Sequence, residues 1–277
     1  MSAGAPDLLG TIVAGTRHLV EARRARETAD TLERQASGLT AGGDRFLASL
    51  RDPDGPRIIA ECKRRSPSRG ILRENYRPGD IARVYASHGA AAVSVLTEPT
   101  FFDGAPEHLR EVRAAVSLPV LRKDFLVDRY QLWEAVVWGA DAVLLIVAAL
   151  GDEELRTLHA DARALGLAVL VEVHDERELE RAMRAGAEVI GVNNRNLRTL
   201  QVDIEASHRL IGAMPAGAIG VAESGLRGPE DIESLGSVGY RAFLIGETLM
   251  TASEPGQTLR SLRGVQVGLA PEPGGTP

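Results

Sequence analysis

Residues 141–149 read DAVLLIVAA, an aspartate followed by eight consecutive apolar residues. An unbroken apolar run, in place of strict alternation, is typical of a parallel strand buried on both faces of its sheet. Seven further runs of the same kind flank this one along the chain: RIIAECK (57–63), AAVSVLTE (91–98), LPVLRKDF (118–125), LAVLVEVH (167–174), EVIGVNN (188–194), AGAIGVAES (216–224) and RAFLIGE (241–247). The sequence therefore predicts eight parallel strands.

The segments between the runs are predicted to be helices. Residues 78–90, PGDIARVYASHGA, carry Asp80 near the start and Gly89 after the end, and residues 152–166, DEELRTLHADARALG, have a similar pattern. Acidic residues favour helix starts, and glycine favours helix ends. Eight β/α units within about 200 residues predict an α/β fold, a closed (β/α)8 TIM barrel. A doubly wound open sheet is the competing architecture, but no GxGxxG motif opens the first unit.

The two ends of the chain are predicted to lie outside the barrel. Residues 1–45 contain no strand-like run, and apolar residues recur at roughly helical spacing in residues 16–37, TRHLVEARRARETADTLERQAS. We therefore expect an N-terminal helical extension over residues 1–45 that packs on a barrel formed by residues 46–263. Residues 264–277 are rich in proline and glycine, which predicts a disordered tail.

Composition limits the partners and the compartment. The formal net charge of −6 argues against non-specific nucleic-acid binding. The single cysteine, Cys62, excludes an internal disulfide or a cysteine-based zinc site, which fits a reducing cytoplasm. The opening residues, MSAGAPDLLG, lack the features of a signal peptide, and no stretch is apolar enough to span a membrane. We expect a cytoplasmic protein without nucleic-acid or membrane partners, either a monomer or a homodimer.

Lysine is rare in this chain. Of the 32 lysine and arginine residues only two, Lys63 and Lys123, are lysines, in a composition that indicates a GC-rich genome. Codon drift in such a genome converts lysine to arginine wherever a positive charge suffices, so a lysine that persists marks a site where arginine fails. Lysine can give or take a proton, whereas arginine stays charged. Both lysines are therefore candidates for acid–base chemistry, with chance survival as the alternative.

Polar residues gather at the ends of the predicted strands. Active sites of (β/α)8 barrels lie at the C-terminal ends of the strands. Glu61 and Lys63 are two residues apart and are expected to face the barrel interior together, whereas Cys62 faces outward. Other strand ends supply Lys123, Phe125, Glu172, Asn193, Arg195, Glu223 and Ser224. A structural ion pair explains Glu61 and Lys63 alone, but polar groups at five strand ends are hard to explain as packing, because buried unpaired charge is costly.

Glycine, serine and phenylalanine residues indicate what the mouth of the barrel would bind. Gly225 and Gly246 follow the last two predicted strands and precede helix starts, an arrangement that barrels use to bind phosphate. Residues 66–70, SPSRG, form a polar loop with Ser66 that could close over an anion, with a plain surface loop as the alternative. An apolar wall is predicted from Leu96, Phe102 and Phe125. Together these residues predict an aromatic, phosphorylated and carboxylated substrate.

The predicted chemistry is acid–base chemistry by the two lysines and two or three glutamates. The sequence has no His/Asp/Cys cluster with the spacing of metal ligands, so neither a metal nor a redox cofactor is expected. Among the six histidines only His174, at the end of the run 167–174, is expected near the mouth.

Seven stretches of the sequence resemble one enzyme family. IIAECKRRSPSRG, SVLTEPTFFDG, LPVLRKDF, LVEVH, IGVNNRNL, AESG and LIGETLM occur in this order between residues 58 and 250. They resemble indole-3-glycerol-phosphate synthase of tryptophan biosynthesis, and the N-terminal helical extension is similar too. The resemblance implies a lyase that converts 1-(2-carboxyphenylamino)-1-deoxy-D-ribulose 5-phosphate into indole-3-glycerol phosphate, CO2 and water without a cofactor.

The resemblance also implies roles for individual residues. Lys123 would protonate the ketone oxygen as a general acid, and Lys63 would bind the carboxylate that leaves as CO2 and serve as an acid in the later dehydration. Glu172 would exchange protons during dehydration. The other residues implied for the site are Glu61, Asn193, Ser224, Glu223, Arg195, Leu96, Phe102 and Phe125, and, around the phosphate, Ser66, Gly225, Gly246 and Glu247. Because some relatives carry serine in place of Glu247, we expect the Glu247 carboxylate to turn away from the phosphate.

Two alternative interpretations are a phosphoribosylanthranilate isomerase-like barrel and a non-catalytic scaffold barrel. The isomerase would need a cysteine and an aspartate at strand ends, and Cys62 is expected to face outward. A non-catalytic copy would be expected to have lost some of the candidate catalytic residues, and all of these are present: Lys63, Lys123, Glu172 and Asn193.

Overall fold

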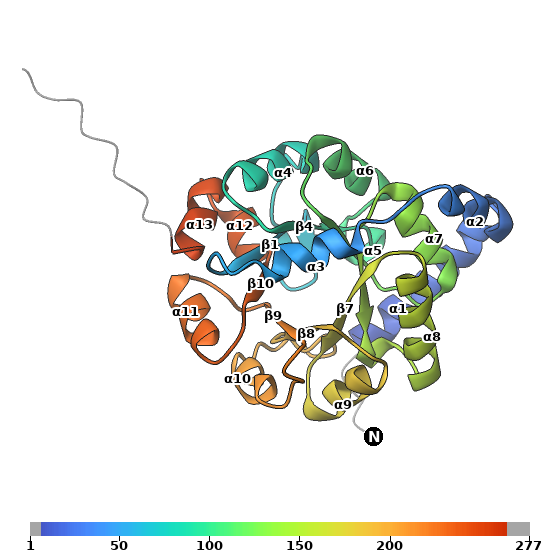
Figure 1. The fold of residues 1–277 in the computed structure, drawn as a ribbon. Helices are drawn as coiled ribbons and strands as arrows, with labels where there is room; N and C mark the ends of the chain where they lie inside the picture. The colour runs from blue at the N-terminus through green and yellow to red at the C-terminus, as the bar shows by residue number, and fades with distance from the viewer. Residues whose placement is uncertain (1–6, 265–277) are drawn as a thin grey trace, which may run out of the picture.

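The computed structural model describes residues 7–264, and eight parallel strands form a closed barrel at its centre (Figure 1). Neighbouring strands follow chain order, and β1 pairs with both β4 and β10, which closes the ring. This closure confirms the predicted (β/α)8 fold over the open sheet. The strands are β1 (Arg57–Cys62), β4 (Ala92–Leu96), β5 (Val120–Lys123), β6 (Ala142–Ile146), β7 (Ala168–Val173), β8 (Val189–Asn193), β9 (Ile219–Glu223) and β10 (Ala242–Ile245).

Helices surround the barrel in a ring (Figure 1). Gly89 and Gly166 lie just after two of these helices with φ angles of 89° and 77°, a left-handed conformation that glycine adopts without strain. The ring consists of α4 (Pro78–Ser87), α6 (Pro106–Ala115), α7 (Arg129–Trp138), α8 (Asp152–Ala164), α9 (Glu176–Arg184), α10 (Glu205–Ile211), α11 (Pro229–Ser237) and α13 (Pro255–Leu262). The loops at the C-terminal ends of the strands carry β2 (Arg65–Ser66), β3 (Gly70–Ile71), α5 (Pro99–Phe102), the 3-10 turn η1 (Val147–Ala149) and α12 (Glu247–Thr251).

Alternation along each strand divides the apolar core into two layers. On β6, Val143 and Leu145 belong to the layer between the strands and the helices, whereas Leu144 and Ile146 belong to the layer inside the barrel. The other strands divide in the same way, because successive side chains point to opposite faces of a sheet. This alternation decides which polar residues at the strand ends face the interior.

The N-terminal extension contacts both ends of the barrel. It consists of α1 (Leu8–Arg24), α2 (Ala29–Ser37) and α3 (Gly43–Arg51), so α3 crosses the expected boundary between residues 45 and 46. Helix α3 closes the end where the strands begin, and α1 reaches the end where they finish. Phe46, Leu47 and Leu50 of α3 pack with the inner layer of the barrel, and Figure 1 shows α3 lying across the strands. Gly43 donates its N–H to the Gly166 carbonyl at 2.9 Å. A Cβ on residue 43 would lie 2.4 Å from that oxygen, so only glycine allows this approach.

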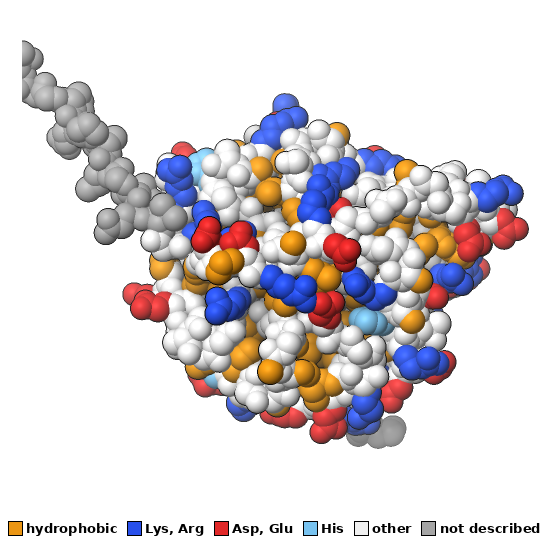
Figure 2. All heavy atoms as spheres, viewed as in Figure 1, with side chains coloured by type: hydrophobic (Ala, Val, Ile, Leu, Met, Phe, Trp, Pro, Cys, Tyr) orange, Lys and Arg blue, Asp and Glu red, His pale blue; other side chains and the backbone are white. Residues whose placement is uncertain are grey.

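On the α3 side of the molecule, acidic and basic side chains are interspersed with apolar ones on the surface (Figure 2). No helix in the range 7–264 is both long enough and apolar enough to cross a bilayer. The predicted disordered tail lies, from residue 265, outside the described residues.

Candidate active site

A cavity of about 450 Å³ opens at the C-terminal ends of the strands. Every residue that the sequence placed in the site lines it: Glu61, Lys63, Ser66, Leu96, Phe102, Lys123, Phe125, Glu172, Asn193, Arg195, Glu223, Ser224, Gly225, Gly246 and Glu247. These residues come from loops and strands distributed around the whole barrel. The closed ring brings them together, because all eight strands end at the same face.

Four charged residues form one layer across the floor of the cavity. Glu61, Lys123, Glu172 and Glu223 lie on β1, β5, β7 and β9, which are alternate strands of the barrel. The interior of a (β/α)8 barrel is built from such layers, with four side chains from alternate strands in each. Apolar residues fill the deeper levels on the same strands, so this charged layer marks the point where the core ends and the cavity begins.

Lys123 occupies the centre of this charge distribution. Its Nζ lies 3.5 Å from Glu172 Oε2 and 3.5 Å from Glu223 Oε2. Burial alone would lower the pKa of Lys123, but the carboxylates of Glu223, Glu172 and Glu61 outweigh burial and raise it above the usual value. Lys123 is therefore an ammonium at neutral pH, which is the state that a proton donor requires.

Lys63 and Glu61 form a second charged pair at the cavity wall. Lys63 Nζ lies 2.6 Å from Glu61 Oε1, as the shared inward face of the two residues predicts. Burial alone would raise the pKa of Glu61, but the charges of Lys63 and Lys123 together lower it. Glu61 stays ionised and holds the Lys63 ammonium over the cavity.

Cys62 faces the opposite side of β1. Its Sγ is buried in the layer between strands and helices, 3.9 Å from the Pro78 carbonyl, and burial raises the pKa of the thiol. A cysteine in this position cannot act as an acid or base in the cavity. The outward orientation predicted for Cys62 is confirmed, which removes the residue that an isomerase-like mechanism would need.

Two glycines on the intervening strands make room for the carboxylates. A Cβ on Gly191 of β8 would lie 2.1 Å from Glu223 Oε1, and a Cβ on Gly246 after β10 would lie 2.2 Å from Glu61 Oε1. Contacts this short would force the buried carboxylates to move. Gly246 was predicted to lie beside a phosphate. The structure adds a steric role for it, because it leaves room for Glu61 at the floor of the cavity.

We expect Gly191→Ala to displace Glu223 and thereby to lower kcat/KM. We also expect it to lower the free energy of unfolding by about 1–3 kcal/mol, the usual cost of overpacking a core. Gly212→Ala is the matched control, because a Cβ at residue 212 meets nothing within 4 Å. Steady-state kinetics and chemical unfolding of both variants measure the effect. Equal behaviour of the two variants would contradict the steric role of Gly191.

Glu223 is expected to make stability depend on pH. Burial, together with the charges of Glu172 and Glu61, raises the pKa of Glu223 from 4.5 to about 8 against the opposing effect of Lys123. Between these two values the folded state holds a proton that the unfolded chain loses, so stability falls as pH rises. We expect Glu223→Gln to abolish this part of the pH dependence, so that its melting temperature falls less than that of the wild type between pH 6 and pH 9. Glu233→Gln, at an exposed position, should follow the wild type.

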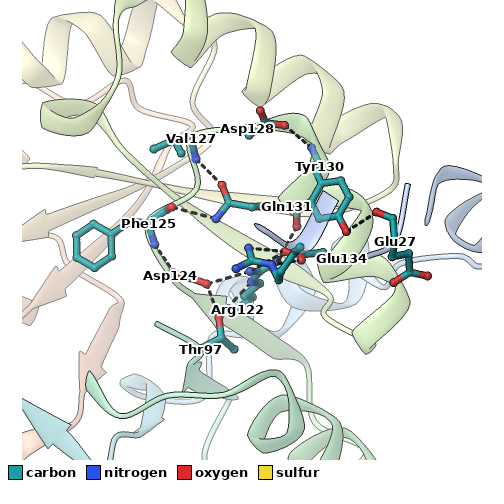
Figure 3. A network of polar contacts seen from close by, with 11 residues as sticks. Glu27, Thr97, Arg122, Asp124, Phe125, Val127, Asp128, Tyr130, Gln131 and Glu134 are labelled. Atoms are coloured by element: carbon teal, nitrogen blue, oxygen red, sulfur yellow. Dashed lines mark hydrogen bonds and ion pairs between the residues drawn. The ribbon is translucent and has the colours of Figure 1, made fainter. Parts of the chain in front are cut away.

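The strand end that carries Lys123 is held by a network of polar contacts on the outer side of the barrel (Figure 3). Arg122 and Asp124 flank Lys123 and point outward, and the Arg122 guanidinium lies 2.9 Å from Asp124 Oδ2 and 3.2 Å from Glu134 Oε2. The guanidinium also stacks over the Trp138 ring at 4.2 Å from its centroid. Only 1% of the Arg122 side chain is exposed, so these partners compensate its buried charge.

The same network fixes the backbone on both sides of Lys123. The Lys123 carbonyl accepts the Thr97 N–H at 3.2 Å, and Asp124 Oδ1 accepts the Phe125 N–H at 2.8 Å. Gln131 accepts the Val127 N–H at 2.8 Å and donates to the Phe125 carbonyl at 3.1 Å. Lys123 and Phe125 therefore point into the cavity from a segment that has little freedom to move.

Apolar residues form one wall of the cavity. The rings of Phe102 and Phe125 lie 6.1 Å apart between their centroids, and Leu96 lies beside them on the cavity surface. Leu8 and Ile12 of α1 complete this wall from the N-terminal extension. The sequence analysis missed these two residues, because nothing in their local pattern distinguishes them from other apolar residues of an amphipathic helix. Leu197, Leu200 and Val202, in the loop after β8, also line the cavity and were missed as well.

The opposite rim carries turns with exposed backbone and charged side chains. Ser224 and Gly225 follow β9 with φ angles of 63° and 77°, and the left-handed conformation of a serine is a strain that clusters at functional sites. Glu247 Oε1 accepts from Arg69 Nε at 2.8 Å, and its Oε2 lies 3.5 Å from Arg195. Arg69 and Arg195 thus hold the Glu247 carboxylate at the rim, and its orientation away from a bound phosphate stays a prediction.

Known proteins with similar sequences or folds identify the family. Residues 9–262 match the family model of indole-3-glycerol phosphate synthase. The chain is 49% identical over 257 residues to indole-3-glycerol phosphate synthase 2 of Streptomyces coelicolor, which covers 93% of this chain and 99% of that protein. It is 46% identical over 259 residues to the indole-3-glycerol phosphate synthase of Dechloromonas aromatica, covering 92% and 98%.

Solved structures of lower identity share the barrel. Thiamine phosphate pyrophosphorylase from Pyrococcus furiosus matches 76% of this chain and 96% of its own length with a TM-score of 0.58 and 15% identity. A protein from Streptococcus mutans described as KGPDC has a TM-score of 0.58 and 12% identity over 76% of this chain and 96% of its own. These likenesses support the fold alone. The family match and the identity to its members over nearly the full chain settle the assignment: this chain belongs to the indole-3-glycerol phosphate synthase family.

Proposed function

We propose that the cavity converts 1-(2-carboxyphenylamino)-1-deoxy-D-ribulose 5-phosphate into indole-3-glycerol phosphate, CO2 and water. Membership of the family makes the chain a carboxy-lyase of tryptophan biosynthesis. The observation that carries the assignment of roles is the Lys123 ammonium, 3.5 Å from the buried carboxyl groups of both Glu172 and Glu223 at the floor of the cavity. A buried proton donor among fixed charges suits a reaction in which an oxygen gains charge.

Lys123 acts first, as the proton donor for ring closure. The new carbon–carbon bond forms at the ketone carbon, and the electron pair of the C=O bond moves to the oxygen. A proton from Lys123 Nζ neutralises that oxygen as a hydroxyl group. The segment around Lys123 is fixed by Asp124 and Gln131, so the ammonium keeps its direction while the bond forms.

Loss of CO2 follows from the product of closure. Closure leaves an iminium beside the carbon that bears the carboxylate, and the electron pair of the breaking carbon–carbon bond flows into this iminium. Lys63, held at 2.6 Å by Glu61, supplies the cation that positions the carboxylate before it leaves. The substrate itself provides the electron sink, so this step needs only binding and orientation from the chain.

Dehydration then forms the indole ring. The hydroxyl group leaves as water with a proton from an acid, for which Lys63 is assigned, and Glu172 removes a proton from the ring system. Within the described residues, the side-chain oxygens of Glu172 and Glu223 accept no hydrogen bond. Lys123 forms an ion pair with one oxygen of each residue. Buried acceptors of this kind are normally satisfied, which suits contacts with substrate hydroxyls near Asn193.

The two ends of the substrate fit the two sides of the cavity. The aromatic ring lies against Phe102, Phe125 and Leu96. The phosphate lies at the opposite rim, where Ser66 and the backbone N–H groups at Gly225 and Gly246 face it, with Arg195 and Ser224 beside the sugar. The Glu247 carboxylate stays with Arg69 and Arg195 and leaves its backbone N–H to the phosphate.

The proposal also covers the setting of the enzyme. A small phosphorylated substrate of amino-acid biosynthesis and a single buried cysteine fit a cytoplasmic protein that acts as a monomer or homodimer. Nucleic acid and membranes have no part in this proposal.

A fluorescence assay of indole formation by the purified protein tests the function. We expect product from the carboxyphenylamino-deoxyribulose phosphate and stoichiometric release of CO2. Phosphoribosylanthranilate, offered separately, tests the isomerase-like alternative, and we expect no turnover. A folded protein that converts neither compound would contradict the proposal and support the scaffold interpretation.

A further inference from the structure

A histidine links the catalytic floor of the cavity to the surface of the barrel. Glu172 has 1% of its side chain exposed, His174 has 12%, and Glu178, on the first turn of α9, has 16%. Residues 172 and 174 are two positions apart, so their side chains leave the chain on the same side. The proposed reaction uses Glu172 and assigns nothing to His174 or Glu178.

Glu178 fixes the orientation of the His174 ring. Its Oε2 accepts the backbone N–H of His174 at 2.8 Å and lies 3.1 Å from ring Nδ1. A carboxylate only accepts hydrogen bonds, so Nδ1 carries the proton in this contact. Asp175 caps α9 by accepting the Glu178 N–H at 2.8 Å, which holds Glu178 in position. The second ring nitrogen, Nε2, is thereby aimed at Glu172.

The contact between His174 and Glu172 requires a proton. Nε2 of His174 lies 3.8 Å from Glu172 Oε1, and within the described residues both are buried atoms without a hydrogen-bond partner. In a neutral ring protonated at Nδ1, Nε2 presents a lone pair, so two acceptors would face each other in a buried site. That arrangement is costly. A proton on Nε2 converts it into an attractive charged pair.

We propose that His174 is a positioning residue for Glu172, an imidazolium in the ligand-free protein whose Nε2–H points at Glu172 Oε1. Lys123 lies 3.5 Å from the other oxygen of the same carboxylate, so Glu172 has a cation at each oxygen. These two cations fix the direction of the Glu172 carboxylate until the substrate arrives. The inference rests on the proposed function, in which Glu172 removes a proton during dehydration.

The charges around His174 support the imidazolium. Burial alone would lower the pKa of His174, but the contact with Glu178 and the charges of Glu172, Glu178 and Glu223 outweigh burial and raise it above 6.5. The charged groups that face the ring are thus Glu172 on β7, Glu178 on α9 and, further away, Glu223 on β9. Acidic groups from three elements surround one ring.

NMR of the ring nitrogens in the ligand-free protein tests the imidazolium without the reaction. We expect both nitrogens of His174 to carry protons at pH 6.5, and we expect Glu172→Gln to lower the pKa of His174, because an amide replaces a carboxylate. His159 on α8 serves as the internal reference, whose titration Glu172→Gln should leave unchanged. An unprotonated Nε2 at pH 6.5, or a His174 pKa that Glu172→Gln does not change, would overturn the inference.

Two replacements of His174 separate its contacts. Asparagine places an amide where Nδ1 lies and keeps the contact with Glu178, whereas glutamine reaches the position of Nε2 and can donate to Glu172. We expect His174→Asn to lower kcat at least about 10-fold with little change in KM, less than the 10²–10⁴-fold expected for a group that transfers the proton itself. We expect His174→Gln to recover part of kcat but to lose the pH dependence due to the imidazolium.

His159→Asn is the matched control, since it removes a histidine of α8 away from the cavity, and we expect wild-type kinetics. An active wild type with an equally active His174→Asn at every pH would contradict this inference and leave the proposed function intact. A wild type without synthase activity, but with an imidazolium at His174, would contradict the proposed function alone.

Discussion

Replacing Lys123 by arginine is expected to lower kcat by about 10²–10⁴-fold, the usual contribution of a positioned general acid. Arginine preserves the positive charge between Glu172 and Glu223, so the net charge on the floor of the cavity does not change. Its guanidinium does not give up a proton in the accessible pH range, and its planar shape does not fit the place of a compact ammonium. The loss therefore isolates proton donation from charge. Steady-state fluorescence of the product measures it, and circular dichroism checks that the variant is folded.

Lys63→Arg is the matched variant for this experiment, because it makes the same change at the other lysine of the cavity. The proposed first role of Lys63 is to hold the carboxylate, which arginine can also do. We expect Lys63→Arg to retain more CO2 release than indole formation, because its second role, as an acid in dehydration, is lost. Near-normal turnover by Lys123→Arg would refute the role assigned to Lys123.

Removing Glu134 is expected to lower the free energy of unfolding by about 3–5 kcal/mol, the range found when one partner of a buried ion pair is deleted. Glu134 is buried on α7 and lies 3.2 Å from the Arg122 guanidinium, which is almost fully buried. Glu134→Ala leaves that guanidinium with Asp124 as its remaining carboxylate partner. Arg23 of α1, which donates to Glu134 Oε1 at 2.5 Å, loses its partner as well. Chemical unfolding monitored by fluorescence measures the change.

Glu153→Ala is the control for this prediction. Glu153 pairs with Arg156 at 2.5 Å, but the side chains are 76% and 61% exposed, and exposed ion pairs contribute little to stability. If Glu134→Ala and Glu153→Ala lost similar amounts of unfolding free energy, the contacts of Glu134 with Arg122 would not stabilise the protein as a buried ion pair. A lower kcat in Glu134→Ala, measured on the folded fraction, would further connect this network with the position of Lys123.

Patterns within single segments were enough to predict the frame of the active site. Unbroken apolar runs identified the strands, since a parallel strand buried on both faces needs apolar residues at every position. Alternation then assigned Glu61 and Lys63 to the interior and Cys62 to the exterior, because this parity is a local property of a strand. Because active sites of (β/α)8 barrels lie at the C-terminal ends of the strands, the polar residues at those ends could be predicted to form the site.

Contacts between distant segments could not be predicted in the same way. Leu8 and Ile12 reach the cavity only because α1 packs across the end of the barrel, and the sequence of an amphipathic helix does not specify its partner. Glu247 meets Arg69 and Arg195 from two other loops, and the motif that contains Glu247 does not specify these partners. The clearance that Gly191 provides for Glu223 depends on the register between β8 and β9.

The sequence alone determined the barrel, the identity of the residues at its mouth and the family, because these follow from local hydrophobic period and from motifs that are continuous in the chain. The tertiary structure alone decided how those residues act on one another: one lysine between two glutamates, a histidine facing a carboxylate, and glycines that leave space for charge. Electrostatic energies depend on distances of a few ångströms and on burial. Neither quantity exists until segments far apart in the sequence are packed together.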